Sequence, residues 1–123
     1  MAQHNELGKW GESLAVDRLT AEGFAILETN WRMGHLELDI VARRGDTVVV
    51  AEVKTRSDHD VDPLESIDNR KIRNIVRAAE VFINSRKLPH RVRFDLFAIN
   101  GTPDNYTLEH LPDAFHPPVR TYR

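Results

Sequence analysis

Apolar positions recur along the chain with two different periods, and these predict a mixture of helices and strands. Between residues 5 and 22 the apolar positions share one side of a helix, and Gly23 is a typical helix terminus. The predicted elements are a helix over 5–22, strands over 24–31, 36–43 and 47–54, a helix over 66–86, and strands over 92–99 and 106–110. This order predicts an α/β protein with a mixed β-sheet flanked by helices.

Both predicted helices have features that bear on packing and charge. In the first helix, Gly8 and Gly11 lie on the apolar side, where each predicts close packing against the sheet, and Glu12 lies at the border of that side. In the second helix the arginines Arg70, Arg73 and Arg77 share the face opposite the apolar stripe. That stripe consists of Ile72, Ile75, Val76, Ala79 and Ile83.

The second and third strands form a predicted hairpin around a tight turn at Gly45 and Asp46. In the second strand Leu36, Leu38 and Ile40 alternate with Glu37 and Asp39. Counting outward from the turn pairs Asp39 with Glu52 and Glu37 with Lys54 across the two strands. Two carboxylates facing each other repel, and a divalent cation between them would reverse the sign of that interaction.

This arrangement favours a metal-dependent phosphodiester-cleaving site. Asp39 and Glu52 are the candidate metal ligands, and their hard oxygen atoms suit Mg²⁺ or Mn²⁺. Lys54, two residues after Glu52 on the same strand face, could orient or deprotonate a water or neutralise phosphate charge. Glu37 is a candidate for a second ion or for an ion pair with Lys54. The alternative is that these charges line the solvated face of a sheet.

Composition narrows the class of protein. With 123 residues the chain is expected to form one domain, with a proline-containing C-terminal tail over 112–123. It has no cysteine, which excludes disulfides and thiolate zinc sites. The longest apolar run, Val48 to Ala51, is too short to span a membrane, and the first residues lack the order of a signal peptide. A cytoplasmic protein without a membrane partner is therefore expected.

The net charge of −2 does not favour nucleic-acid binding, but the distribution of charge does. Residues 70–93 carry eight basic groups and one acid, an asymmetry typical of a surface that binds a polyanion. The candidate nucleic-acid-binding residues are Arg70, Lys71, Arg73, Arg77 and Arg56. A solvated helix face remains the alternative.

Other polar and aromatic positions give weaker indications. His59 lies in an aspartate-rich loop over 57–62 that is expected to be a polar loop, with metal binding as the alternative. Trp10 and Trp31 are candidates for stacking on bases, and core packing is favoured for Trp10. Asp95 lies within an apolar strand and is expected to pair with a nearby basic residue.

Several stretches together resemble the YraN-like family of small bacterial predicted endonucleases, which are related to archaeal Holliday-junction resolvases of the PD-(D/E)xK superfamily. The matching stretches are Gly11-Glu12, Ala15, Leu19, Gly23, Ile26-Leu27, Asn30, Arg32, residues 37–42, residues 52–56, Pro63, Glu65, Lys71, Ala79 and Arg93-Phe94-Asp95. The resemblance covers nearly the whole chain in order. One departure is Leu36, where the family usually has glycine, and altered packing is expected there.

The resemblance implies a restriction-endonuclease-like core and assigns roles by position. It implies that Asp39 and Glu52 bind metal, that Lys54 is the catalytic lysine, and that Glu12 is the helix carboxylate of the resolvase relatives. DNA, including branched or recombination intermediates, is the implied partner, and a homodimer is open because a four-way junction has two-fold symmetry. The alternatives are a non-catalytic nucleic-acid-binding module that retains the fold, and an adaptor whose acidic face is only solvated.

Overall fold

The computed structural model describes residues 2–57, 67–89 and 91–117. All seven expected elements are present in the expected order, which confirms the α/β class. They are α1 (Ala2–Ala21), β1 (Ala25–Met33), β2 (Leu36–Arg44), β3 (Thr47–Arg56), α2 (Asn69–Arg86), β4 (Arg91–Thr102) and β5 (Asn105–Leu111). Most of the polar loop with His59 lies outside the described residues. No helix in the described part is long and apolar enough to cross a membrane.

The five strands form one mixed sheet in the order β1-β2-β3-β4-β5. Only β3 and β4 are parallel, and the other neighbours are antiparallel. β3 is therefore the central strand, which explains its run of valines that are apolar on both faces. Arg44 pairs with Thr47, which confirms the expected tight turn at Gly45 and Asp46.

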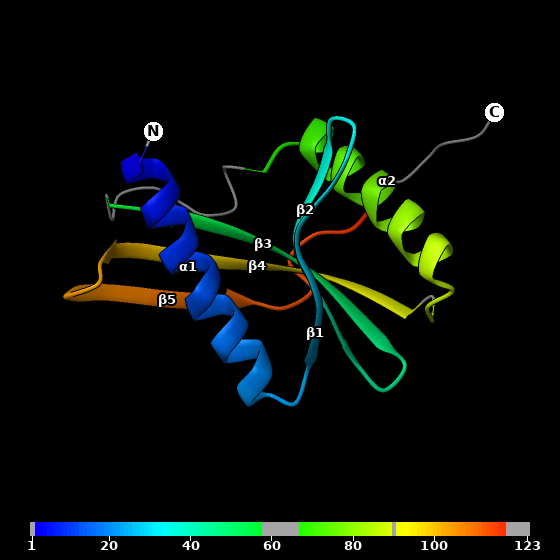
Figure 1. Cartoon of the computed structure of the whole chain (residues 1–123), viewed down its shortest axis with the longest axis horizontal. Coiled ribbons are helices and arrows are strands. Elements are labelled where there is room, and N and C mark those ends of the chain that lie inside the picture. The colour runs from blue at the N-terminus through cyan, green and yellow to red at the C-terminus, as the bar shows by residue number, and fades with distance from the viewer. Residues whose placement is uncertain (1, 58–66, 90, 118–123) are drawn as a thin grey trace.

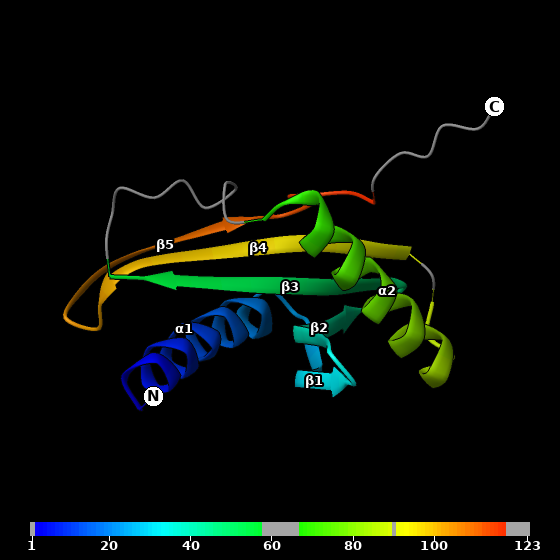
Figure 2. The ribbon, with the colours of Figure 1, turned by 90° about the horizontal axis from the view of Figure 1, so that it is seen from above.

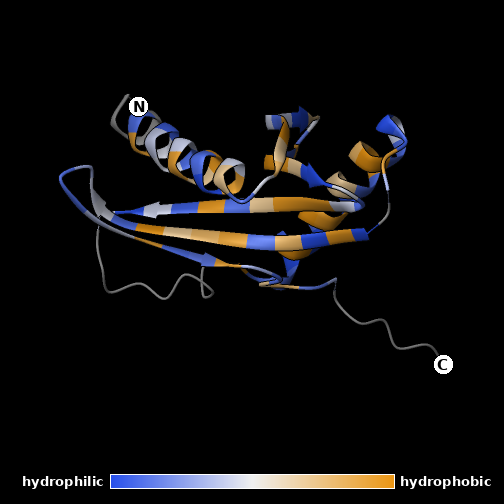
Figure 3. Ribbon diagram, turned by 90° about the horizontal axis from the view of Figure 1, so that it is seen from below, coloured by the Kyte–Doolittle hydropathy of each residue, from blue (hydrophilic) through white to orange (hydrophobic). Residues whose placement is uncertain are grey.

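The two helices cover opposite faces of the sheet. Alternate residues of β3 pack into two clusters: Val49 and Ala51 lie with α1, whereas Val48 and Val50 lie with α2. Figure 2 shows α1 lying along one side of β3, β4 and β5. Hydrophobic residues concentrate along the middle of the strands, between the two helices (Figure 3). Of the expected apolar stripe of α2, Ile75, Ala79 and Ile83 are buried, and Ile72 and Val76 are half-buried against the same cluster. The buried side also includes Ala78 and Phe82, which the predicted stripe omits.

Local hydrogen bonds fix the helix ends. After α1 the chain turns at Gly23, with φ at 90°, and the Phe24 amide donates to the Leu19 carbonyl at 3.0 Å. The stop expected at Gly23 is thus confirmed, and it has the geometry of a Schellman motif. The start expected for the second helix at residue 66 is not where α2 begins. Asp68 caps it by accepting from the Lys71 amide at 2.9 Å, so the helix starts at Asn69.

The expectation of close packing holds for one of the two glycines of α1. A side chain at Gly11 would overlap the hydroxyl and methyl groups of Thr55 on β3, so the helix and the sheet touch at this point. A side chain at Gly8 would meet nothing within 4 Å. The expectation for Gly8 is therefore wrong, and Figure 2 shows the beginning of α1 farther from β3 than its end.

β2 does not keep one face throughout its length, contrary to the simple alternation expected. Leu36 and Leu38 pack in the cluster beneath α2, whereas Ile40 packs in the cluster beneath α1. The break coincides with a corner in β1, where Asn30 has a positive φ of 52° and a bulge lies between Ile26 and Glu28. In Figure 1 the outer part of the β1–β2 pair accordingly runs across the direction of β3, β4 and β5.

The expected partner of Asp95 is Arg93, which donates two hydrogen bonds to it at 2.8 and 2.9 Å. His110 on β5 lies 2.8 Å from the same carboxylate, so this buried group joins β4 to β5. Residues 112–117, expected as the start of a tail, are held to β4 at two residues: the Ala114 amide donates to the Phe94 carbonyl at 2.8 Å, and Phe115 is buried and stacks on the Phe94 ring.

The two tryptophans lie in the interior or against it. Trp31 packs edge-on against Phe82, with ring centroids 5.3 Å apart, so its ring belongs to the core beneath α2 and the stacking role considered for it is not favoured. Trp10 packs against the α1 cluster and edge-on against Tyr106, which confirms the core expectation.

Candidate functional site

The candidate site forms where β2 leaves β3. The ladder between these strands runs from the turn to the pair Ile40–Ala51, and the structure continues β2 along β1 beyond that point. The expected cross-strand pairs Asp39–Glu52 and Glu37–Lys54 are therefore wrong as ladder pairs. Instead, the Asp39 carboxylate takes the place of a strand carbonyl and accepts from the Val53 amide at 2.9 Å. The side chain thereby satisfies a backbone donor that the departing strand would leave open.

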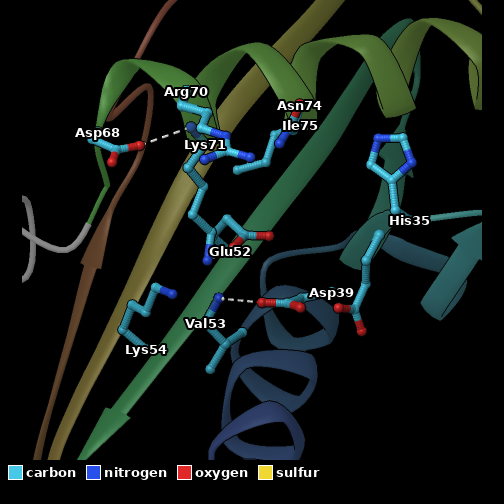
Figure 4. Close-up of a pocket in the computed structure, with 11 residues that line it drawn as sticks. His35, Asp39, Glu52, Val53, Lys54, Asp68, Arg70, Lys71, Asn74 and Ile75 are labelled. Atoms are coloured by element: carbon cyan, nitrogen blue, oxygen red, sulfur yellow. Dashed lines mark hydrogen bonds and ion pairs between the residues drawn. The ribbon is translucent and has the colours of Figure 1, made fainter.

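The expected side chains nevertheless converge in one cavity of about 500 Å³ between β2, β3 and the beginning of α2. Figure 4 shows Glu52 and Lys54 projecting from β3, Asp39 beside Val53, and Lys71 reaching down from α2. The cavity is lined by His35, Glu37, Asp39, Glu52, Val53, Lys54, Asp68, Arg70, Lys71, Asn74 and Ile75. Asp39, Glu52, Lys54 and Glu37 of the predicted site are thus brought together.

Glu52 is a buried acid in an apolar strand, with 3% of its surface exposed. Burial, together with the nearby Asp39 carboxylate, raises the pKa of Glu52 to about 8. The Lys71 ammonium, 3.5 Å from the Glu52 carboxylate, and the Lys54 ammonium oppose that rise. Burial also raises the pKa of Asp39, although the hydrogen bond from Val53 favours its ionised form. A cation in the cavity would stabilise the ionised form of both carboxylates and lower the pKa of each.

Two lysines, Lys54 and Lys71, supply the positive charge next to these acids. Burial and the neighbouring Lys71 ammonium lower the pKa of Lys54 to about 8, so this amine exchanges its proton near neutral pH. Lys71 has the opposite behaviour: burial opposes its charge, but the Lys54 amine and the carboxylates of Glu52 and Asp39 together raise its pKa. One lysine is therefore held charged, and the other is suited to give and take a proton.

Two further acids lie around Asp39. Glu12 on α1 accepts a hydrogen bond from the Asn30 side chain at 2.7 Å. Burial raises the pKa of Glu12, and the Asp39 and Glu37 charges add to that effect, which places this carboxylate near the site from the α1 side. Among the described residues Glu37 forms its ion pair with Arg32, at 3.3 Å. The ion pair with Lys54 that the sequence suggested is not seen there.

The predicted nucleic-acid-binding residues separate into two groups. Arg70 and Lys71 line the cavity. Arg73 and Arg77 are exposed on the side of α2 opposite its buried residues, as expected, whereas Arg70, the third arginine of the predicted face, lines the cavity. Arg56 is also exposed, at the end of β3, where it donates to the Thr55 carbonyl at 3.3 Å.

The sequence pattern missed the role of several residues in building this site. Lys71 was grouped with the surface arginines, although it precedes the buried Ile75 by four positions and therefore lies on the side of α2 that borders the core. Asp68 was not singled out, although an aspartate before a helix is a typical N-cap. The contact between Asn30 and Glu12 has no sequence signal, because the two residues are 18 positions apart.

The donor set fits a hard divalent cation. Among the described residues no group of three or more acidic, histidine or cysteine side chains could hold a metal ion. The candidate ligands are the two carboxylates Asp39 and Glu52, which line the same cavity. Mg²⁺ is commonly bound by one or two carboxylates, with waters and substrate phosphate in the remaining positions. A buried acid whose pKa is raised next to a second acid is a functional-site signal, since stability alone disfavours it.

Fold and site together define an α/β protein with a mixed five-stranded sheet, consistent with a nuclease-like core, and a cavity beside its central strand that is lined by acidic and basic side chains. Within that class the chain belongs to the uncharacterised protein family UPF0102, whose sequence profile matches residues 11–99. This confirms the YraN-like resemblance. Similar proteins include UPF0102 proteins of Bacteroides fragilis, 44% identical over 97% of this chain and 99% of the relative. Others are those of Flavobacterium johnsoniae, 42% identical over 94% and 98%, and Parabacteroides distasonis, 40% identical over 98% and 100%.

Proposed function

We propose that the protein is a divalent-metal-dependent endonuclease that hydrolyses DNA phosphodiester bonds. The observation that supports this most is the convergence of Asp39, Glu52 and Lys54 at the point where β2 leaves β3. Burying two acids and a lysine whose pKa is lowered does not favour a stable fold, whereas phosphodiester hydrolysis can use such groups to hold a metal ion and to activate a water.

Each residue has a role that follows from its position. Asp39 and Glu52 would hold Mg²⁺ or Mn²⁺, which polarises the phosphate and lowers the pKa of a bound water. Lys54 lies two residues beyond Glu52, and its amine has a pKa of about 8, which suits it to accept a proton from the attacking water. The backbone amide of Val53 holds the Asp39 carboxylate in one orientation. Glu12, held by the hydrogen bond from Asn30, adds a third carboxylate near Asp39 from the α1 side.

The substrate is proposed on charge and on family resemblance. Arg70 at the cavity and Arg73 and Arg77 on the outer side of α2 form a basic surface adjoining the site, which suits a phosphate backbone. Branched or recombination intermediates are proposed from the relation to Holliday-junction resolvases, and a homodimer would match their two-fold symmetry. A cytoplasmic location fits such a substrate.

The test is a cleavage assay on labelled four-way junction, flap, single-stranded and plain duplex DNA with Mg²⁺ or Mn²⁺. We expect metal-dependent cleavage by the wild type and a loss of at least about 100-fold in Asp39→Ala and Lys54→Ala, since each removes a group that acts in the transition state. The ranking of the four DNAs would identify the preferred structure.

Matched substitutions on the surface control for handling and for contaminants. Asp46→Ala removes an exposed acid from the β2–β3 turn, and Lys87→Ala removes an exposed lysine after α2. Both should cleave as the wild type does. Cleavage that survives in Asp39→Ala and Lys54→Ala would refute the assignment of the site.

A second candidate function is a nucleic-acid-binding module that does not cleave. Arg73 and Arg77 favour it, because they are exposed on the outer side of α2 and contribute nothing to the cavity as the described residues line it. This module would bind DNA equally well with alanine at Asp39 and would show no cleavage in the wild type.

A further inference from the structure

The Lys71 side chain forms an ion pair with Glu52, one of the two candidate metal ligands. Its ammonium is 3.5 Å from the Glu52 carboxylate, and it also compensates the Asp39 charge. In Figure 4 the side chain extends from α2 towards the region between β3 and Asp39. The carboxylate at the far end of this contact is almost fully buried, whereas Lys71 keeps 38% of its side chain exposed. The lysine is therefore the partner that has room to move.

The backbone beneath Lys71 is fixed. Its amide donates to the Asp68 carboxylate at 2.9 Å as part of the N-cap of α2, and Ile75 one turn later is buried in the core. A change at the site would therefore displace the flexible four-carbon side chain and leave the helix in place. An ammonium on such a stem can compensate a carboxylate in one rotamer and contact a phosphate in another.

On the basis of the proposed metal-dependent function, we propose that Lys71 is an internal counter-ion that competes with the divalent cation for Asp39 and Glu52 and transfers to substrate phosphate when the cation binds. Metal and nucleic acid then bind cooperatively. The cation has to displace the ammonium from the carboxylates, and a phosphate gives the displaced ammonium a new partner. Lys71 is thus a binding residue with opposite effects on the two ligands: it weakens binding of the metal alone and strengthens binding of DNA in the presence of metal.

The decisive experiment measures Mn²⁺ binding to chelator-treated, full-length protein without DNA, from the electron paramagnetic resonance signal of free Mn²⁺. We expect Lys71→Met to bind Mn²⁺ about tenfold more tightly than the wild type, within the usual range of coupling between two ligands. Lys71→Gln provides a second neutral variant should the methionine disturb packing. Thermal melting of each variant verifies that it is folded.

Two controls separate this role from a general loss of positive charge. Lys71→Arg keeps a cation on a long stem and should bind Mn²⁺ as the wild type does. Arg73→Met removes an exposed charge from the same helix and should leave Mn²⁺ affinity within about twofold, because solvent and salt screen it. A gain in affinity for Lys71→Met that Arg73→Met reproduces would overturn the proposal.

A second measurement follows the linkage to nucleic acid. The affinity for a short DNA duplex is measured with and without Ca²⁺, which also takes oxygen ligands. We expect Ca²⁺ to increase the wild-type affinity by about tenfold and to have a much smaller effect in Lys71→Met, since the coupling is reciprocal. An equal effect of Ca²⁺ in both proteins would overturn the transfer to phosphate.

The outcomes distinguish this proposal from the proposed nuclease. Mn²⁺ affinity that is unchanged or lower in both neutral variants, or absent from all the proteins, would overturn the counter-ion role. If the wild type cleaved no DNA while both neutral variants bound Mn²⁺ more tightly, the counter-ion role would be supported and the nuclease function would fail. DNA cleavage by a wild type whose neutral variants gain no affinity for Mn²⁺ would give the converse result.

Discussion

Glu52 shows how a single residue can be unfavourable for the fold and informative about function. Its carboxyl group is buried in the central strand next to a second acid, and these surroundings raise its pKa to about 8. A folded state that favours the protonated acid loses stability as the pH rises through the range where the unfolded chain has already ionised. Glu52 therefore lowers the free energy of unfolding at neutral and higher pH, a cost that is common at functional sites.

We predict that Glu52→Gln stabilises the protein at pH 9 in the presence of a chelator. The pKa of Glu52 is 4.5 in the unfolded chain and about 8 in the folded protein, so wild-type stability decreases between these values and its ionisation penalty is complete above pH 8. Glutamine has no charge to bury, so the variant should gain about 2 kcal/mol at pH 9 and almost nothing at pH 5. Chemical denaturation at both pH values measures this.

Mg²⁺ should reverse the order, because it would stabilise the wild type and not the variant. Asp46→Asn, at an exposed position, serves as the control. A Glu52→Gln protein that is less stable than the wild type at pH 9 would contradict the account of its buried charge.

At the residue scale the sequence predicted the members of the site better than their contacts. Asp39, Glu52 and Lys54 converge as expected, but Asp39 bonds to the Val53 amide instead of facing Glu52 across a ladder. The cross-strand pairs that the turn predicts between β2 and β3 are correct as far as Ile40 and Ala51. Beyond that pair the prediction fails, because β2 separates from β3 at this point. The corner at Asn30 depends on a contact with Glu12, 18 positions away, which no local pattern shows.

At the scale of elements, the position of α1 depends on one close contact. Gly11 places the helix backbone against Thr55, one residue after Lys54 on β3. The same close contact brings the neighbouring Glu12 near the carboxylates of Asp39 and Glu37. Periodicity and turn signals predicted every helix and strand, although β1 and β5 consist of half-buried and exposed residues alone. Periodicity could not distinguish Gly11 from Gly8, because both share the apolar side of α1 and only the crossing point with the sheet separates them.

We predict opposite effects of the same substitution at these two glycines. Gly11→Ala should destabilise the protein by about 1–3 kcal/mol, because its methyl group would overlap the Thr55 side chain. Gly8→Ala should stabilise it by about 0.5–1 kcal/mol, since alanine favours the helix and meets no neighbour. Thermal or chemical unfolding of both variants provides the comparison.

The double substitution Gly11→Ala with Thr55→Ala tests the cause. Removing the hydroxyl and methyl groups of Thr55 should restore part of the lost stability, which a double-mutant cycle measures as a coupling energy. Additive effects would show that the two residues do not meet.

At the scale of the whole molecule, basic groups occupy two places. Lys54, Arg70 and Lys71 line the cavity together with the acids, while Arg73 and Arg77 lie on the outer side of α2. A net charge of −2 conceals this arrangement, and only the local surplus of basic groups in residues 70–93 indicated it. The division of that surplus between cavity and surface could not be predicted, because it depends on where α2 begins.

We predict that Arg73→Glu with Arg77→Glu weakens DNA binding by about tenfold or more and lowers the slope of log affinity against log salt by about 2. Asp39→Ala should leave binding without metal intact, because that residue belongs to the cavity. Fluorescence anisotropy over a range of salt concentrations measures both quantities.

The matched control is Arg18→Glu, an exposed arginine on α1, which covers the opposite face of the sheet. It should change the affinity and the salt slope much less than the pair on α2. Equal effects from the two helices would assign DNA binding to the overall charge instead of one surface.

The parallel pairing of β3 with β4 also has a consequence for the order of folding. Thr47 pairs with Arg91, 44 positions further along the chain, whereas β1, β2 and β3 are joined by short turns. Local contacts form faster than distant ones, so the three-stranded meander should precede the docking of α2 and β4. The meander brings Asp39 and Glu52 close before the ammonium of Lys71 arrives. Docking of α2 therefore adds the Lys71 charge to that of Lys54, which is already on β3, and the site should be completed only in the last stages of folding.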